Sequence, residues 1–106
     1  MDAHTALVRT RNLISDESNW CGSGWGYGGQ RCVLHALAIA QGDFDATDPT
    51  ELVGYTDLKR IVGGVGYFND NCTHAEVLAL CDAAIAATAP QPDTSFLNEV
   101  ETEIAA

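Results

Sequence analysis

Apolar residues recur at helical spacing in four stretches of the chain, and the alternation typical of strands is nearly absent. The first stretch follows Asp2, which can cap a helix, and should end near Ser15, where "SDESN" gives a polar break. The second, "RCVLHALAIAQG" (residues 31–42), is apolar almost all the way round, which is typical of a central helix. Gly42 is a natural stop for it.

The third stretch begins at "DPTE", where Asp48 can cap a helix and Pro49 takes the first helical position. Its apolar positions continue to Val62, but Gly54 interrupts them, so one bent helix and two short helices both fit. The fourth begins with a capping box in "THAE" (residues 73–76) and is halted by "APQP".

Two connecting segments are rich in glycine and aromatic residues: "NWCGSGWGYGGQRC" (residues 19–32) and "VGYFNDNC" (residues 65–72). Glycine disfavours regular helix, so both are predicted to be irregular loops whose aromatic rings cover each other at one end of a bundle. The pattern as a whole predicts an all-α fold. It is a bundle of four helices, with five as the alternative, and two glycine- and aromatic-rich loops.

Residues 1–92 are predicted to form a single helical domain. Residues 93–106 carry four acids and no base, and they form either an acidic tail or a short docking helix. No apolar run approaches the length of a membrane span, and no secretory signal is recognisable at the start, so a cytoplasmic location with reduced cysteines is expected.

Net charge is more informative about possible partners than the overall composition is. The chain has 106 residues, with fifteen Asp and Glu against five Lys and Arg, for a net charge of −10. That balance disfavours direct binding to nucleic acid or to an anionic membrane, and it favours a protein partner with a basic surface. A candidate acidic face combines Asp43, Asp45, Asp48, Glu51 and Asp57. A solvated surface with helix capping explains the same residues equally well.

Cysteine and histidine offer a second kind of site where the two glycine-rich segments meet. The candidate residues of that meeting point are Trp20, Cys21, Trp25, Tyr27, Asn69 and Asp70. A zinc ion would have Cys21, Cys32, His35, Cys72 and His74 as possible ligands, although the closely spaced pairs of zinc modules are missing. Free cysteine in an apolar run more often packs as a small hydrophobic side chain.

A thiol enzyme is the other form of this site. Cys21 would be the nucleophile, His35 or His74 the base, and Asn69 or Asp70 the orienting group. The start of the second helix is expected to lower the pKa of Cys32. A phosphate-binding loop is disfavoured, because no strand precedes the glycines and no Gly-Lys-Ser/Thr follows them.

Several short motifs resemble a small all-helical family of unknown function from bacteria and phages. Trp20-Cys21, Cys32 at the head of an alanine-rich helix, Asn69-Asp70 and Val77-Leu78 match its pattern across residues 5–88. His35 stands where a small residue is expected, and the spacer after Cys21 is unusually rich in glycine. The resemblance implies an all-α fold and no established activity.

The function predicted from these observations is that of a small acidic, non-enzymatic interaction protein without a cofactor. A concrete form is a phage or mobile-element inhibitor, similar in action to an anti-CRISPR protein, whose carboxylates block a basic nucleic-acid-binding surface. The alternative is the Cys/His site, holding zinc or acting as a thiol enzyme. The oligomeric state is left open.

Overall fold

A computed structural model describes residues 1–26, 28–44 and 48–90 of the chain. In these residues the regular structure is helical, which confirms the all-α prediction. The elements are α1 (Ala3–Leu13), the short 3-10 helix η1 (Glu17–Asn19), α2 (Val33–Ala40), the 3-10 helix η2 (Pro49–Glu51), α3 (Tyr55–Val62), α4 (Val65–Asn71) and α5 (His74–Thr88).

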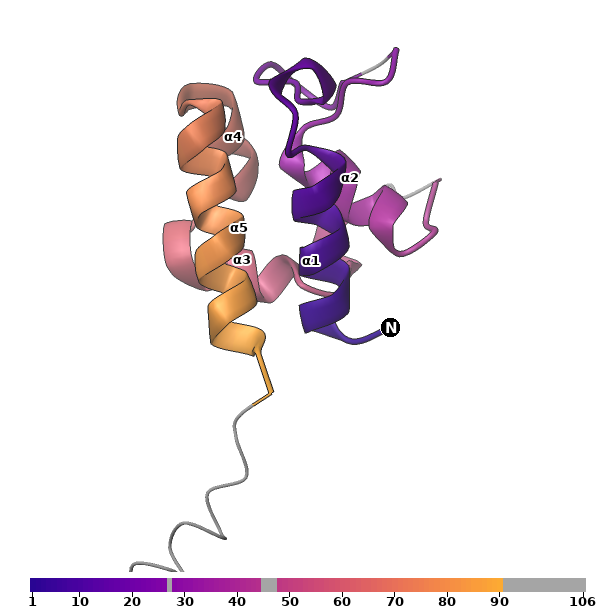
Figure 1. Cartoon of the computed structure of the whole chain (residues 1–106), viewed down its shortest axis with the longest axis vertical. Coiled ribbons are helices and arrows are strands. Elements are labelled where there is room, and N and C mark those ends of the chain that lie inside the picture. Colours follow the sequence, from indigo (N-terminus) through magenta and orange to yellow (C-terminus); the bar gives the residue numbers. More distant parts are fainter. Residues whose placement is uncertain (27, 45–47, 91–106) are drawn as a thin grey trace, which may run out of the picture.

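The helices pack around α1 and α5, which lie side by side (Figure 1). Helix α2 packs against α1 and α4, and α3 packs against α5 and α4. Each helix therefore contacts at least two others. No helix in the described part of the chain has both the length and the apolar character needed to cross a membrane.

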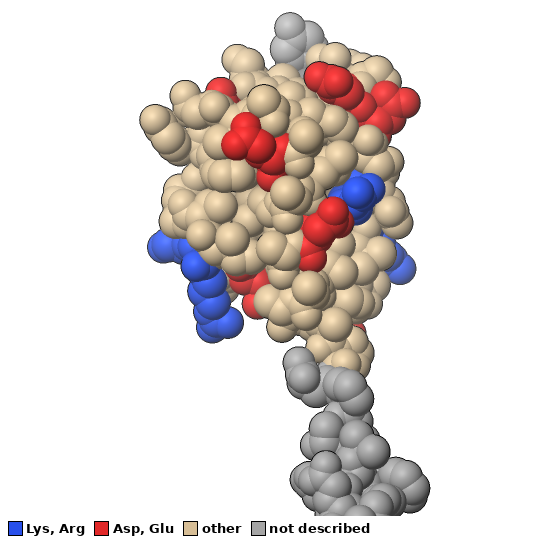
Figure 2. Space-filling view, turned by 60° about the vertical axis from the view of Figure 1, so that its left-hand side comes forward, with Lys and Arg blue, Asp and Glu red and all other residues tan. Residues whose placement is uncertain are grey.

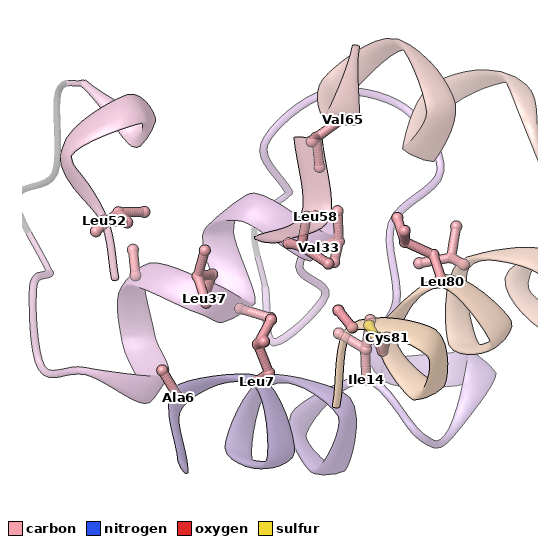
Figure 3. Close-up of a cluster of buried hydrophobic side chains, with 14 residues drawn as sticks. Ala6, Leu7, Ile14, Val33, Leu37, Leu52, Leu58, Val65, Leu80 and Cys81 are labelled. Carbon is pink, nitrogen blue, oxygen red and sulfur yellow. The ribbon is translucent and has the colours of Figure 1, made fainter. Parts of the chain in front are cut away.

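The core draws one or more side chains from every α-helix (Figure 3). Leu7, Leu37, Leu58 and Val65 are each at most 1% exposed, and Leu80 is 3% exposed. They come from α1, α2, α3, α4 and α5 in that order. This cluster is the main source of stability, because burying such a side chain contributes about 1.5–3 kcal/mol.

Local capping signals placed the starts of α1, η2 and α5 correctly. The Asp2 carboxylate accepts a hydrogen bond from Thr5 N at 2.8 Å and caps α1. Helix α2 begins two residues later than predicted, because Arg31 is paired with an earlier segment and Cys32 serves as the N-cap. The third stretch is two short elements, and Gly54 separates them with a φ of +92°.

The prediction of an irregular loop at residues 65–72 is wrong, because Val65–Asn71 is helical. Val65 and Asn69 are buried in the body of the protein, and Phe68 packs against the core. These three residues are spaced for one face of a helix, so tertiary packing outweighs the low helix propensity of the glycine between them. Residues 93–106 lie outside the described residues.

Helix α5 begins with the predicted capping box. Thr73 Oγ1 accepts from Glu76 N at 3.2 Å, and Glu76 Oε1 accepts from Thr73 N at 3.0 Å. The hydrogen bonds from the Thr73 backbone and hydroxyl hold the pKa of Glu76 below its ordinary value of 4.5. The carboxylate therefore stabilises the folded state above that value.

We expect the unfolding free energy of the wild type to exceed that of Glu76→Gln at neutral pH, and the difference to shrink in acid. The sign follows from a lowered pKa, since the contribution of Glu76 disappears as the pH falls through its folded-state value. Urea unfolding of both proteins from pH 7 to about pH 3 measures the difference. A difference that stays constant with pH would contradict the capping role.

Candidate functional site

The glycine-rich loop (residues 19–32) is closed at its base by backbone pairing. Cys21 N donates to Arg31 O at 2.9 Å, and Arg31 N donates to Asn19 O at 3.0 Å. This makes Trp20 and Arg31 partners in an isolated parallel β-bridge. The two ends of the loop are thus held together before α2 begins.

Within the loop, glycine is required by geometry at Gly26. Its φ is +94°, and an added Cβ would lie 2.3 Å from Gln30 O. The chain comes this close because Cys32 N donates to Trp25 O at 3.1 Å, which folds the loop back on itself. Any side chain at Gly26 would force the loop open.

Asn69 of α4 connects the loop to the helical body. It is fully buried, and its Oδ1 accepts from Trp20 Nε1 at 2.8 Å and from Val33 N at 3.0 Å. Its Nδ2 donates to Cys21 O at 2.8 Å. One side chain therefore provides hydrogen-bond partners for the Cys21 carbonyl, the Trp20 indole N–H and a free N–H at the first turn of α2.

Three further contacts hold the same region. Asp70 Oδ1 accepts from Gly24 N at 3.1 Å, which ties the middle of the loop to α4. The Trp20 ring lies against Gly22, where an added Cβ would be 2.7 Å from a ring carbon. The Trp20 ring also lies near the His74 ring, with the two ring centroids 5.3 Å apart. The loop is pinned at three points along its length.

The exposed part of the loop presents Trp25. The indole is 40% exposed and stacks on the imidazole of His35, with centroids 4.5 Å apart and planes 13° apart. His35 Nδ1 is also 2.9 Å from Trp25 O. A histidine of α2 therefore fixes the position of an exposed tryptophan.

The structure brings together most of the residues predicted for the meeting point of the two segments. Trp20, Cys21, Asn69 and Asp70 are joined directly, and Tyr27 lies outside the described residues. The predicted mutual cover of aromatic rings is wrong for Tyr67, which is 77% exposed. The two segments meet instead through the amide of Asn69.

The predicted zinc ligands do not form a metal site. Among the residues that the structure describes, no three His, Cys, Asp or Glu side chains are placed to hold a metal ion. His35 contacts the carbonyl of Trp25, and His74 Nε2 lies 2.6 Å from Ile14 O. No sequence pattern indicates that these histidines contact backbone carbonyl oxygens, so sequence reasoning missed this structural role.

The expected activation of Cys32 is also wrong. Burial raises the pKa of its thiol, and this outweighs the hydrogen bonds from His35 N and the neighbouring backbone that lower it. Burial likewise raises the pKa of Cys81 to about 12. In the described part of the chain, no histidine ring is hydrogen-bonded to a cysteine sulfur, whereas a thiol enzyme needs its base in contact with the nucleophile.

The acidic residues of the candidate face have different surroundings. Asp43 and Glu51 are exposed, and Asp45 lies outside the described residues. Asp48 caps η2 by accepting from the hydroxyl and N of Thr50, and these bonds lower its pKa. Asp57 is half-buried, with Oδ1 3.8 Å from Arg60 Nη1.

On the face shown in Figure 2, Asp and Glu side chains lie at several places, with neighbouring ones at the upper right, and Lys and Arg side chains lie on the same face. All five bases and ten of the fifteen acids are in the described residues. Half of the net charge of −10 therefore lies in the rest of the chain.

The described structure has an open groove between α1 and α2. It is lined by Arg9, Asn12, Leu13, Ile39 and Ala40. None of the residues predicted for a site lines it.

Comparison with known families gives one match. The pattern of a family described as "Family of unknown function (DUF6197)" covers residues 2–87, which is most of the chain. Of the motifs named for the resemblance, Trp20-Cys21 and Asn69-Asp70 are joined by hydrogen bonds of Asn69. Comparison with curated proteins and with solved structures gives no match.

Proposed function

The chain belongs to this family of unknown function, and we propose that it is a non-enzymatic interaction module that binds a protein with a basic surface. The binding surface in this proposal is the exposed side of the glycine-rich loop, centred on Trp25. The acidic charge of the chain acts at longer range by drawing the partner in.

One observation carries the proposal: a fully buried asparagine holds an exposed, glycine-rich loop in one shape. Asn69 hydrogen-bonds to Trp20 Nε1, Val33 N, Cys21 O and the neighbouring Asp70 carboxylate, and these bonds tie the loop to α4. A loop that is already ordered loses less entropy when it binds, so pre-organisation of this kind favours recognition.

Trp25 is the side chain best placed to make the contact. It is 40% exposed although its ring is held against His35. Tryptophan is over-represented among residues that dominate binding energy, because a rigid ring buries a large area at small entropic cost.

The net charge supports a basic partner. With −10 on the chain, attraction to a basic protein would raise the association rate and would be screened by salt. Inhibition of a nucleic-acid-binding protein, as proposed from the sequence, is one activity within this class and stays a prediction.

The test is affinity capture from a lysate of the encoding organism with wild-type protein, Trp25→Ala and Tyr67→Ala. We expect Trp25→Ala to bind the partner about thirtyfold more weakly and to recover correspondingly less of it, because loss of a central tryptophan costs on the order of 2 kcal/mol. Tyr67→Ala is the matched control, since this aromatic residue is 77% exposed on the outer side of α4 and is expected to leave recovery unchanged.

Two further measurements make the result decisive. Trp25→Ala keeps the backbone carbonyl that binds Cys32 N and His35, so its thermal unfolding should stay close to that of the wild type. Recovery should also fall as salt is raised. A partner that Trp25→Ala retains in full, or one indifferent to salt, would count against the proposal.

A further inference from the structure

Two of the four cysteines directly follow the residues that are paired at the base of the glycine-rich loop. Trp20 and Arg31 are parallel bridge partners, so the next residues in the two segments are Cys21 and Cys32. Neighbouring strands lie about 4.8 Å apart, which places the two Cα atoms near that separation. Disulfides span Cα distances of about 4.4–6.8 Å.

The expected directions of the Cys21 and Cys32 side chains are also compatible with a disulfide. Successive side chains of an extended segment leave it on opposite sides, and residues in register on neighbouring parallel segments leave on the same side. Cys32 is extended, with φ −70° and ψ 169°.

The two thiols differ in access. Cys21 is half-buried in the loop, whereas Cys32 is 6% exposed and is the N-cap of α2. Each sulfur makes one weak hydrogen bond, Cys21 Sγ to Ser23 O at 3.2 Å and Cys32 Sγ from His35 N at 3.3 Å. These bonds involve only nearby residues, so their loss leaves Asn69 and its partners in place.

We propose that Cys21 and Cys32 are a redox modification site, and that exchange with a low-molecular-weight disulfide such as oxidised glutathione joins them across the base of the loop. The Cys21 thiolate attacks the small disulfide, forming a mixed disulfide and releasing one thiolate. The Cys32 thiolate then attacks the Cys21 sulfur and releases the second. The protein loses two thiol protons and two electrons, and the small disulfide becomes two thiols.

The consequence is a loop closed by a covalent bond as well as by hydrogen bonds. The loop contains several glycines with positive φ, so the unfolded chain has much freedom there, and a cross-link removes part of it. The oxidised protein is expected to resist urea better than the reduced protein. This inference does not depend on the proposed partner.

The experiment is equilibration of the full chain with glutathione redox buffers, with and without urea, followed by acid quench, alkylation and mass spectrometry. We expect folded protein to lose two of its four thiols and to yield a peptide that links Cys21 to Cys32. The effective concentration of this pair should be at least about tenfold higher in the folded than in the unfolded chain, because the bridge holds the two cysteines together.

Three variants complete the test. Cys21→Ser and Cys32→Ser should each abolish the internal disulfide, and serine at position 32 remains a good N-cap. Cys72→Ser is the matched control, since Cys72 lies at the end of α4 and should not matter. Four remaining thiols, a glutathione adduct on Cys21 as the final product, a link to Cys72, or an effective concentration no higher in the folded chain would each overturn the proposal.

Discussion

We expect Asn69→Leu to lower the free energy of unfolding by about 4 kcal/mol, the largest effect of any single substitution considered. The substitution keeps the approximate size of the side chain but removes every hydrogen bond it makes. Trp20 Nε1, Val33 N and Cys21 O would all lose a partner, and of these residues Val33 is buried whereas Trp20 and Cys21 are half-buried. Each unsatisfied buried group costs about 1–3 kcal/mol.

Urea unfolding followed by circular dichroism measures this loss. The matched control is Asn71→Leu, since Asn71 is exposed on the same helix and its amide donates only to Tyr67 O within the helix. Its cost should stay below about 1 kcal/mol. A loss below about 1 kcal/mol for Asn69→Leu would show that Asn69 does not hold the loop to α4.

Asn69→Asp keeps the size of the side chain and its oxygen acceptor but replaces the amide with a carboxyl group. The new side chain still offers an oxygen to Trp20 Nε1 and Val33 N, but it also introduces a carboxyl into a buried position next to Asp70. Burial and a like charge raise the pKa of such a carboxyl. A raised folded-state pKa means that stability is lost as the pH rises through it, so this variant should be more stable in mild acid than at pH 7.

The second large effect is expected at Leu37. This residue is fully buried at the centre of α2, and its side chain meets Gly54, where an added Cβ would lie 3.3 Å from Leu37 Cδ1. Leu37→Ala would leave a cavity between α2, α1 and the segment before α3. We expect a loss of about 3 kcal/mol, within the range for buried leucine.

Ile39→Ala is the control for Leu37→Ala. It shortens an aliphatic side chain of the same helix by the same number of carbons, but Ile39 is only half-buried, on the wall of the open groove. Its cost should be less than half as large, because neighbours and water can fill the space. Equal losses at the two positions, measured by urea unfolding, would contradict the assigned core.

The two large effects should differ in what they do to binding. Below its unfolding transition, Leu37→Ala keeps the tie between α4 and the loop, so capture of a partner should stay close to that of the wild type. Asn69→Leu releases the loop even where the helices remain folded, so capture should fall as it does for Trp25→Ala. If both variants bind alike, a pre-organised loop is not the binding surface.

Helix starts were the most predictable part of the fold, because capping is local. Asp2 reaches Thr5, and Thr73 and Glu76 reach each other, within three residues along the chain. The apolar pattern of α2 likewise indicated that most of its residues are buried. The same local reasoning failed at residues 65–72, where Gly64 and Gly66 suggested a loop. Packing of Val65 and Phe68 against other helices decides that segment, and that packing involves distant residues.

The sequence predicted which residues of the candidate site meet, but not the surroundings of each side chain. Trp20, Cys21, Asn69 and Asp70 were expected to meet, and they do. That Asn69 would be buried, that His35 would support Trp25, and that Cys32 would have a raised pKa all depend on which groups surround each side chain. Spacing along the chain does not specify those surroundings.

By itself, then, the sequence determined an all-helical fold, the caps of α1 and α5, the break at Gly54 and a strongly acidic chain. These follow from propensities and hydrogen bonds that act over a few residues, and from a sum of charges. Only the tertiary structure decided that the glycine-rich loop closes on itself at the Trp20–Arg31 bridge and that Asn69 holds it to α4. The bridge joins residues 11 positions apart, and the Trp20–Asn69 hydrogen bond joins residues 49 positions apart. Only packing of the whole chain brings such residues together.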